Sequence, residues 1–147
     1  MSNMPVYNLN QLTDGMDDFD AGIVRGAFTA RGYKDGLGRL REAKPFKTVK
    51  TFEQGCINYV WRMLCFDLVG SGKHACMPVC ADFDLWDALE ARDGSRPRHD
   101  NPGYDDWRRR VKNVTDEMNS LVKRAERSIP LEQQKGIVRW GRALGML

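Results

Sequence analysis

Residues 51–69 limit the folds open to this chain more than any other segment, because they predict a long helix that is apolar around most of its circumference. The segment opens with Thr51–Gln54, where the threonine hydroxyl and the glutamine side chain can bond free N–H groups of a first helical turn. It stops at Gly70, a residue type that favours helix termination. Its one clear polar strip consists of Gln54, Asn58 and Arg62. Such a helix needs neighbours on nearly every side, so we predict that it is the buried centre of the fold.

Apolar residues also recur with helical spacing on both sides of this segment. Three aspartates open the first of these helices, and Asp82 or Asp84 is the expected cap of the third. The additional predicted helices cover residues 17–31, 37–43, 83–92, 103–127 and 130–144. We therefore predict a mainly α fold, a single-domain bundle of five or six helices around residues 51–69.

The helix predicted for residues 103–127 has a narrow apolar seam of the kind found in helical bundles. Asn101 and the proline after it supply a cap and a favoured first-turn residue. Acids and arginines four residues apart should form ion pairs along this helix, namely Asp105–Arg109 and Asp106–Arg110. The seam consists of Tyr104, Trp107, Val111, Val114, Met118, Leu121 and Ala125. We expect the protomer to bury this seam internally, with room for a dimer contact at its two aromatic residues.

Length and composition predict one domain that spans residues 1–147. The 147 residues are 41% hydrophobic and 29% charged, which suffices for one core without disulfide bonds. Residues 1–13 have an irregular polar pattern, and the glycine and proline residues within 93–103 predict a mobile loop. The N-terminus lacks the features of a signal peptide, so we expect a cytoplasmic protein with reduced thiols. No apolar run approaches the ~20 residues that span a bilayer, so no membrane association is predicted.

All four cysteines and one of the two histidines fall between residues 56 and 80. The closest group, His74, Cys76 and Cys80, has a spacing compatible with zinc. A fourth ligand would have to come from Cys65, Asp82 or His99. A second cysteine pair is missing, and Cys56 lies on the apolar face of the 51–69 helix, where a thiol behaves as a small hydrophobic group. We therefore predict that the protein binds no metal and needs no cofactor.

The sequence contains no complete catalytic or nucleotide-binding motif. Gly70–Lys73 matches part of a phosphate-binding loop, but the earlier glycine and the hydroxyl residue after the lysine are both missing. A nucleophile pair of Cys76 with His74 or His99 leaves a small Cys/His-dependent enzyme as an alternative. The absence of an intact motif favours a protein that is not an enzyme.

Two groups of basic residues are candidates for binding phosphates or an acidic partner. The first group comprises Arg92, Arg96, Arg98, Arg108, Arg109 and Arg110. The second group comprises Lys135, Arg139 and Arg142, which would share one face of the last predicted helix. In the alternative interpretation, acids at positions 105, 106 and 116 neutralise the first group, and the second group merely complements a helix C-terminus.

The net charge of +3 is too small to indicate a nucleic-acid-binding protein, but acidic and basic segments alternate along the chain. These features favour a small intracellular, non-enzymatic binding protein that occupies a macromolecular partner. It would be of the accessory or inhibitory type, for example from a mobile genetic element. We expect a protein partner first. A nucleic-acid-binding protein that uses residues 92–112 and 135–142 is the main alternative, and a homodimer is compatible with both.

Overall fold

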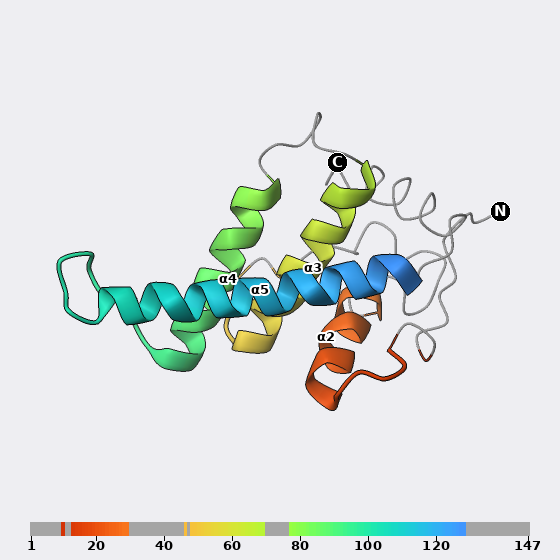
Figure 1. The fold of residues 1–147 in the computed structure, drawn as a ribbon, viewed down its shortest axis with the longest axis horizontal. Helices are drawn as coiled ribbons and strands as arrows, with labels where there is room; N and C mark the ends of the chain where they lie inside the picture. The colour runs from red at the N-terminus through yellow and green to blue at the C-terminus, as the bar shows by residue number, and fades with distance from the viewer. Residues whose placement is uncertain (1–9, 11–12, 30–45, 47, 70–76, 129–147) are drawn as a thin grey trace.

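The computed structural model describes residues 10, 13–29, 46, 48–69 and 77–128 of the chain. These residues contain no strand and form four helices, α2 (Asp18–Thr29), α3 (Phe52–Val69), α4 (Met77–Asp93) and α5 (Tyr104–Ser128), as Figure 1 shows. The prediction of a mainly α fold is confirmed for this part of the chain. The predicted helices at 37–43 and 130–144 lie outside the described residues, so the structure gives four helices where five or six were predicted.

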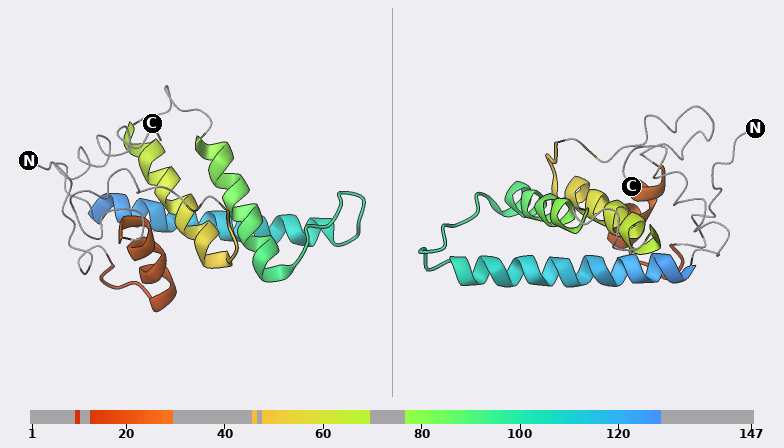
Figure 2. Two further views of the ribbon diagram at one scale, coloured as in Figure 1. Left: turned by 180° about the vertical axis from the view of Figure 1, so that it is seen from behind. Right: turned by 90° about the horizontal axis from the view of Figure 1, so that it is seen from above.

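The four helices lie in two layers, which the right-hand view of Figure 2 separates. Helices α2, α3 and α4 form one layer, and the long α5 crosses it as the second layer. Helix α3 packs against each of the other three helices, so the prediction that this segment is central is confirmed. None of the described helices combines the length and the apolar character that crossing a bilayer requires.

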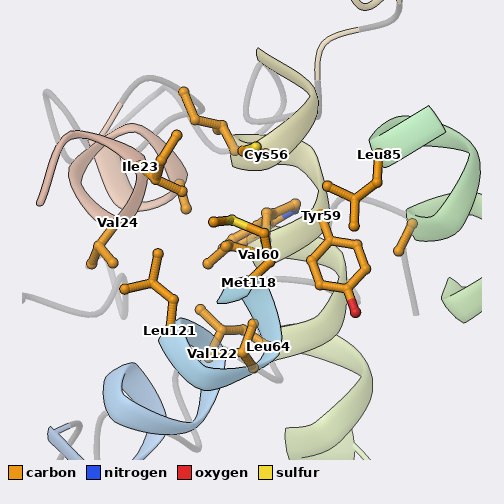
Figure 3. Close-up of a cluster of buried hydrophobic side chains, with 14 of the residues drawn as sticks. Ile23, Val24, Cys56, Tyr59, Val60, Leu64, Leu85, Met118, Leu121 and Val122 are labelled. Carbon is orange, nitrogen blue, oxygen red and sulfur yellow. The ribbon is translucent and has the colours of Figure 1, made fainter. Parts of the chain in front are cut away.

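The core lies where side chains of all four helices meet, and Figure 3 shows part of it. The largest of its fully buried apolar side chains are those of Trp61, Ile23, Leu64, Leu85, Leu89 and Met118. Cys56 is fully buried among them, and burial raises the pKa of its thiol to about 12. The thiol therefore stays protonated at neutral pH, which confirms the prediction that Cys56 serves as a small hydrophobic group.

The apolar seam of α5 packs inside the protomer, as predicted. Its central and C-terminal members are at most 5% exposed: Val114, Met118, Leu121 and Ala125. At the N-terminal end of α5, Trp107 is buried, whereas Tyr104 is only half-buried. The seam therefore anchors most of α5 to the core and leaves an aromatic end at the edge of the molecule.

Capping side chains mark the starts of α2 and α3, and a glycine marks the end of α4, where the sequence predicts them. Thr51 Oγ1 accepts a hydrogen bond from the N–H of Gln54 at 3.1 Å, and Gln54 Oε1 accepts one from the N–H of Lys50 at 2.8 Å. Asp17 Oδ1 accepts a backbone N–H of the first turn of α2 at 2.8 Å. Gly94 follows the end of α4 with a φ of 96°, a conformation that favours glycine.

The structure corrects the predicted start of α4. The helix begins at Met77 rather than at residue 83, so Asp82 and Asp84 are interior residues and not caps. Pro78 is tolerated in the first turn, because the N–H that it lacks would have no helical partner there. The additional turn buries Ala81 in the core that α4 shares with α3. Tertiary packing therefore extends α4 beyond the start that its local residue types indicate.

Residues 94–103 connect α4 to α5 and contain neither helix nor strand (Figure 1). The connection has internal hydrogen bonds, such as that from the N–H of Asn101 to the carbonyl oxygen of Arg98 at 2.9 Å. Asn101 also bonds the start of α5, since its carbonyl oxygen accepts the N–H of Tyr104 at 3.0 Å. The mobility expected for this segment stays a prediction.

The polar strip of α3 faces other parts of the chain rather than solvent alone. Asn58 is fully buried, and its side chain accepts a hydrogen bond from the N–H of Phe46 at 2.7 Å and donates one to the carbonyl of the same residue at 2.9 Å. Arg62 donates to Asp84 of α4 at 2.7 Å. Burial raises the pKa of Asp84, and the charge of Arg62 opposes that shift. This network holds residue 46 and α4 against α3.

A second charged cluster joins α3 to α5 near their C-terminal ends. Lys123 Nζ lies 3.3 Å from the carboxylate of Asp67 and 3.7 Å from that of Glu126. Burial raises the pKa of Glu126 to about 7, and a hydrogen bond and the negative charge of Asp67 add to the shift. The carboxyl group of Glu126 therefore titrates near neutral pH in the folded protein.

Replacement of Glu126 by glutamine should change how stability depends on pH. A carboxyl with a raised pKa holds its proton more tightly in the folded chain, so the wild-type unfolding free energy falls as the pH rises from 4.5 to about 7. Glutamine removes this fall, and we expect Glu126→Gln to gain about 1 kcal/mol relative to wild type between about pH 5 and pH 8. Thermal melts at both pH values measure the gain. An equal gain in the exposed control Glu117→Gln would contradict this assignment.

Candidate interaction surface at the junction of α4 and α5

Four aromatic side chains form a row where α4 meets the N-terminal end of α5. Phe83 packs edge-on against Trp86 of the same helix, with the ring centroids 5.1 Å apart. Trp86 lies 6.4 Å from Trp107 of α5, and Tyr104 stacks on Trp107 at the same centroid distance. Residues three apart share a helix face, so each helix contributes one aromatic pair. The row therefore continues from one helix to the other.

Two arginines complete this group. The guanidinium of Arg96 lies over both indole rings, 5.0 Å from the centroid of Trp86 and 5.4 Å from that of Trp107. The guanidinium of Arg108 lies 5.9 Å from the ring centroid of Tyr104. All three contacts have the geometry of cation–π interactions. We refer to six residues together as the aromatic–arginine surface: Phe83, Trp86, Arg96, Tyr104, Trp107 and Arg108.

A groove of about 580 Å³ runs along this surface. It is lined by Trp86, Tyr104, Asp105, Trp107, Arg108, Arg109, Val111 and Lys112. Three of these side chains are positively charged and one is negatively charged, so the groove combines aromatic walls with a net basic charge. Within the described part of the chain, the buried indole N–H of Trp107 has no acceptor. A groove of this composition can take up an apolar side chain and bind carboxylates beside it.

Most arginines of the first predicted basic group lie at this junction, and most of them form ion pairs with carboxylates of the same chain. Arg92 and Arg110 both contact Asp93, each with an N–O distance of 2.9 Å. The hydrogen bond from Arg92 lowers the pKa of Asp93. Asp106 pairs with Arg110 at 3.2 Å, as predicted, and also with Arg109 at 3.4 Å. Arg109 therefore forms its ion pair with Asp106 and not with the predicted partner Asp105.

The remaining arginines of this group differ in their contacts. Arg96 donates to Glu90 at 2.8 Å, and the exposed Arg98 lies 3.7 Å from Asp100. Arg108 has no carboxylate partner among the described residues and is exposed at the rim of the groove. The second predicted group, Lys135, Arg139 and Arg142, lies outside the described residues. At this junction Arg108 is thus the arginine most open to an external anion.

The structure covers the cysteine–histidine cluster only in part. His74 and Cys76 lie outside the described residues, and Cys80 lies in α4, because that helix begins at Met77 and buries Ala81. His99 is exposed in the connection before α5. Among the residues that the structure describes, no three histidine, cysteine or acidic side chains group as a metal site would require. The prediction that the protein binds no metal, and the alternative of a Cys/His-dependent enzyme, therefore stay predictions from the sequence.

The outward-facing aromatic residues of α4 were not predicted from the sequence. Leu89 of this helix is fully buried, whereas Phe83 is 50% exposed and Trp86 is only half-buried. A signal was present, because Val79, Phe83 and Trp86 recur with spacings of four and three on the side opposite Ala81. That stripe becomes visible only when the helix is extended to include residue 79.

Comparison with protein families, with curated proteins and with solved structures gives no match for this chain. The residue types of the aromatic–arginine surface are therefore what indicates its role. Tryptophan, tyrosine and arginine are the residue types that contribute most of the binding energy at protein interfaces. Here they occur together, on two helices, beside a groove.

Proposed function

We propose that this protein is a non-enzymatic, cytoplasmic binding protein that acts by occupying a macromolecular partner, with protein as the first class of partner. The aromatic–arginine surface carries the proposal. It combines anchors of the type found at interface hot spots with a groove of about 580 Å³ that can accept a partner's side chain. A protein of the accessory or inhibitory type acts simply by occupying its partner in this way. Such a protein could come from a mobile genetic element.

The pairing of arginines at this junction favours a protein partner over a nucleic acid. A protein that follows a phosphate backbone needs several cations free to release counterions. Here Arg92, Arg109 and Arg110 each contact a carboxylate of the same chain. Aromatic side chains with a few charges beside them suit the centre of a protein interface, where charge is depleted.

Capture of a partner from a lysate of the native host tests this proposal. The full chain should retain a host protein that the double variant Tyr104→Ser/Arg108→Ser loses by at least tenfold, which corresponds to about 1.4 kcal/mol. The matched control is Arg127→Ser, an exposed arginine at the other end of α5. Capture that the double variant retains, or that the control also loses, would contradict the role of this surface.

Nucleic-acid binding through residues 92–112 is the rival function, because bases can stack on partly exposed aromatic rings beside Arg108. Retention on immobilised DNA at low and moderate salt separates the two functions. Tight retention that weakens steeply with salt would favour the rival. Weak retention at low salt, together with capture of a host protein, would support the protein partner.

A further inference from the structure

The outer face of α4 exposes large apolar side chains. Val79 is 54% exposed and Phe83 is 50% exposed, and they are two of three such exposed residues in the described part of the chain. They lie one helical turn apart, so their side chains share a face. Trp86, one turn further along, continues the stripe to the groove that it lines. An apolar stripe of this kind on a small helical protein marks a contact surface.

The carboxylates around this stripe are open to an outside partner. Asp82 and Asp87 are both exposed and flank Phe83 on α4. Neither forms an ion pair with any of the residues that the structure describes. The outer face of α4 is therefore apolar and acidic.

The groove beside this face has the complementary character. Its charged residues are Asp105, Arg108, Arg109 and Lys112, which leaves a net positive charge. Arg109 and Lys112 pair with Asp106 and Asp116 of the same helix, so Arg108 is the groove's one cation without a carboxylate partner among the described residues. The aromatic residues of the groove can pack edge to face against a phenyl ring, as Trp86 does with Phe83 of its own helix.

We infer that the occupant of this groove is a second copy of the same chain. Phe83 of one copy enters the groove of the other, and its acidic neighbours Asp82 and Asp87 face the rim residue Arg108. The projecting residue and the groove lie on one surface, with Trp86 contributing to both. A two-fold axis beside Trp86 therefore forms both contacts at once, which is the condition for a closed symmetric dimer.

This inference goes beyond the proposed function and does not depend on it. The dimer contact and the aromatic–arginine surface share Phe83, Trp86 and Arg108, so dimerisation and partner binding would compete. The dimer is tested with the purified chain alone, whereas the proposed function is tested by capture from the host. A failure of one is therefore distinguishable from a failure of the other.

Sedimentation equilibrium of the full chain tests the dimer. At about 100 µM, a concentration suited to a small interface, the wild type should sediment with twice the 16.8 kDa mass of one chain. Phe83→Ser should weaken association at least tenfold and still unfold cooperatively, because the side chain is half exposed. The control Phe19→Ser removes a similarly exposed aromatic side chain from α2 and should leave association unchanged.

A charge exchange tests the orientation of the two copies. Asp87→Arg and Arg108→Glu should each weaken the dimer, and the double variant should regain it, because the exchanged charges then attract across the interface. A wild type that stays monomeric at about 500 µM would overturn the inference, since it leaves the groove to another partner. A dimer that is insensitive to Phe83→Ser, or a double variant that does not recover, would overturn it as well.

Discussion

Val114→Asp is expected to abolish the cooperative thermal unfolding of this protein. Val114 is 5% exposed and packs in the same buried cluster as Val60 of α3. An aspartate there must bury an unpaired charge or take up a proton, which costs about 4 kcal/mol. That cost is a large share of the roughly 5–15 kcal/mol that stabilises a typical domain. Circular dichroism melts of the wild type and the variant measure the loss.

The matched control for this variant is Asn113→Asp. It adds the same carboxylate to the same helix one residue away, where the side chain is exposed, and should shift stability by no more than about 0.5 kcal/mol. If Val114→Asp melted like the wild type and only lost self-association, the seam of α5 would be an interface between subunits. The dimer inferred above predicts the opposite, because it uses the groove at the N-terminal end of the seam and not the buried Val114.

Gly55→Ala is expected to lower the unfolding free energy by about 3 kcal/mol, even though alanine is the better helix former. A Cβ at position 55 would lie 2.4 Å from the Cβ of Ala88 and 2.5 Å from the carbonyl oxygen of Asp84. Both atoms are fixed to the backbone of α4, so α3 and α4 would have to move apart. That movement would also loosen the bond between Arg62 and Asp84 across the same interface. Urea denaturation measures the change.

The control for the glycine variant is Gly22→Ala in α2. The nearest atom to a Cβ there is the flexible Glu53 Oε1 at 3.6 Å, an ordinary contact distance. This substitution should therefore stabilise the protein by about 0.5–1 kcal/mol through helix propensity. Equal effects at positions 22 and 55 would refute the argument that α3 and α4 need a residue without a side chain where they cross.

Two of the helices were predicted almost to the residue. The prediction of 51–69 corresponds to α3 (Phe52–Val69), and that of 103–127 corresponds to α5 (Tyr104–Ser128). Their signals are local: the cap at Thr51 bonds Gln54 three residues later, and the seam of α5 repeats with helical spacing. Interactions within a few residues can be derived from sequence, because the helix geometry that relates them is known in advance.

Helix α4 shows why local signals can fail. Its apolar residues lie on two faces, with Ala81 and Leu85 inside and Val79 and Phe83 outside, so no single stripe marks the helix. Asp84 has the residue type of an N-cap, yet it pairs with Arg62 of α3. The packing against α3 that decides both features involves residues distant in the sequence.

The candidate surface was predictable only in part. The arginine-rich stretches around positions 96 and 108 are evident in the sequence, and so is their nearness to Trp107. The position of Arg96 over the rings of both Trp86 and Trp107 requires α4 and α5 to be docked first. The ion pair of Arg110 with Asp93 likewise joins two helices, and it determines how much basic charge is left for a partner.

The sequence by itself determined the mainly helical fold and the central position of α3, because helix caps and an apolar circumference act within one helix. Only the tertiary structure decided which polar groups enter the interior and which aromatic rings stay outside it. Asn58 is buried because it bonds Phe46, whereas Phe83 stays half exposed because no described helix covers that side of α4. Burial depends on the neighbour that a side chain meets, and that neighbour is set by how the helices pack.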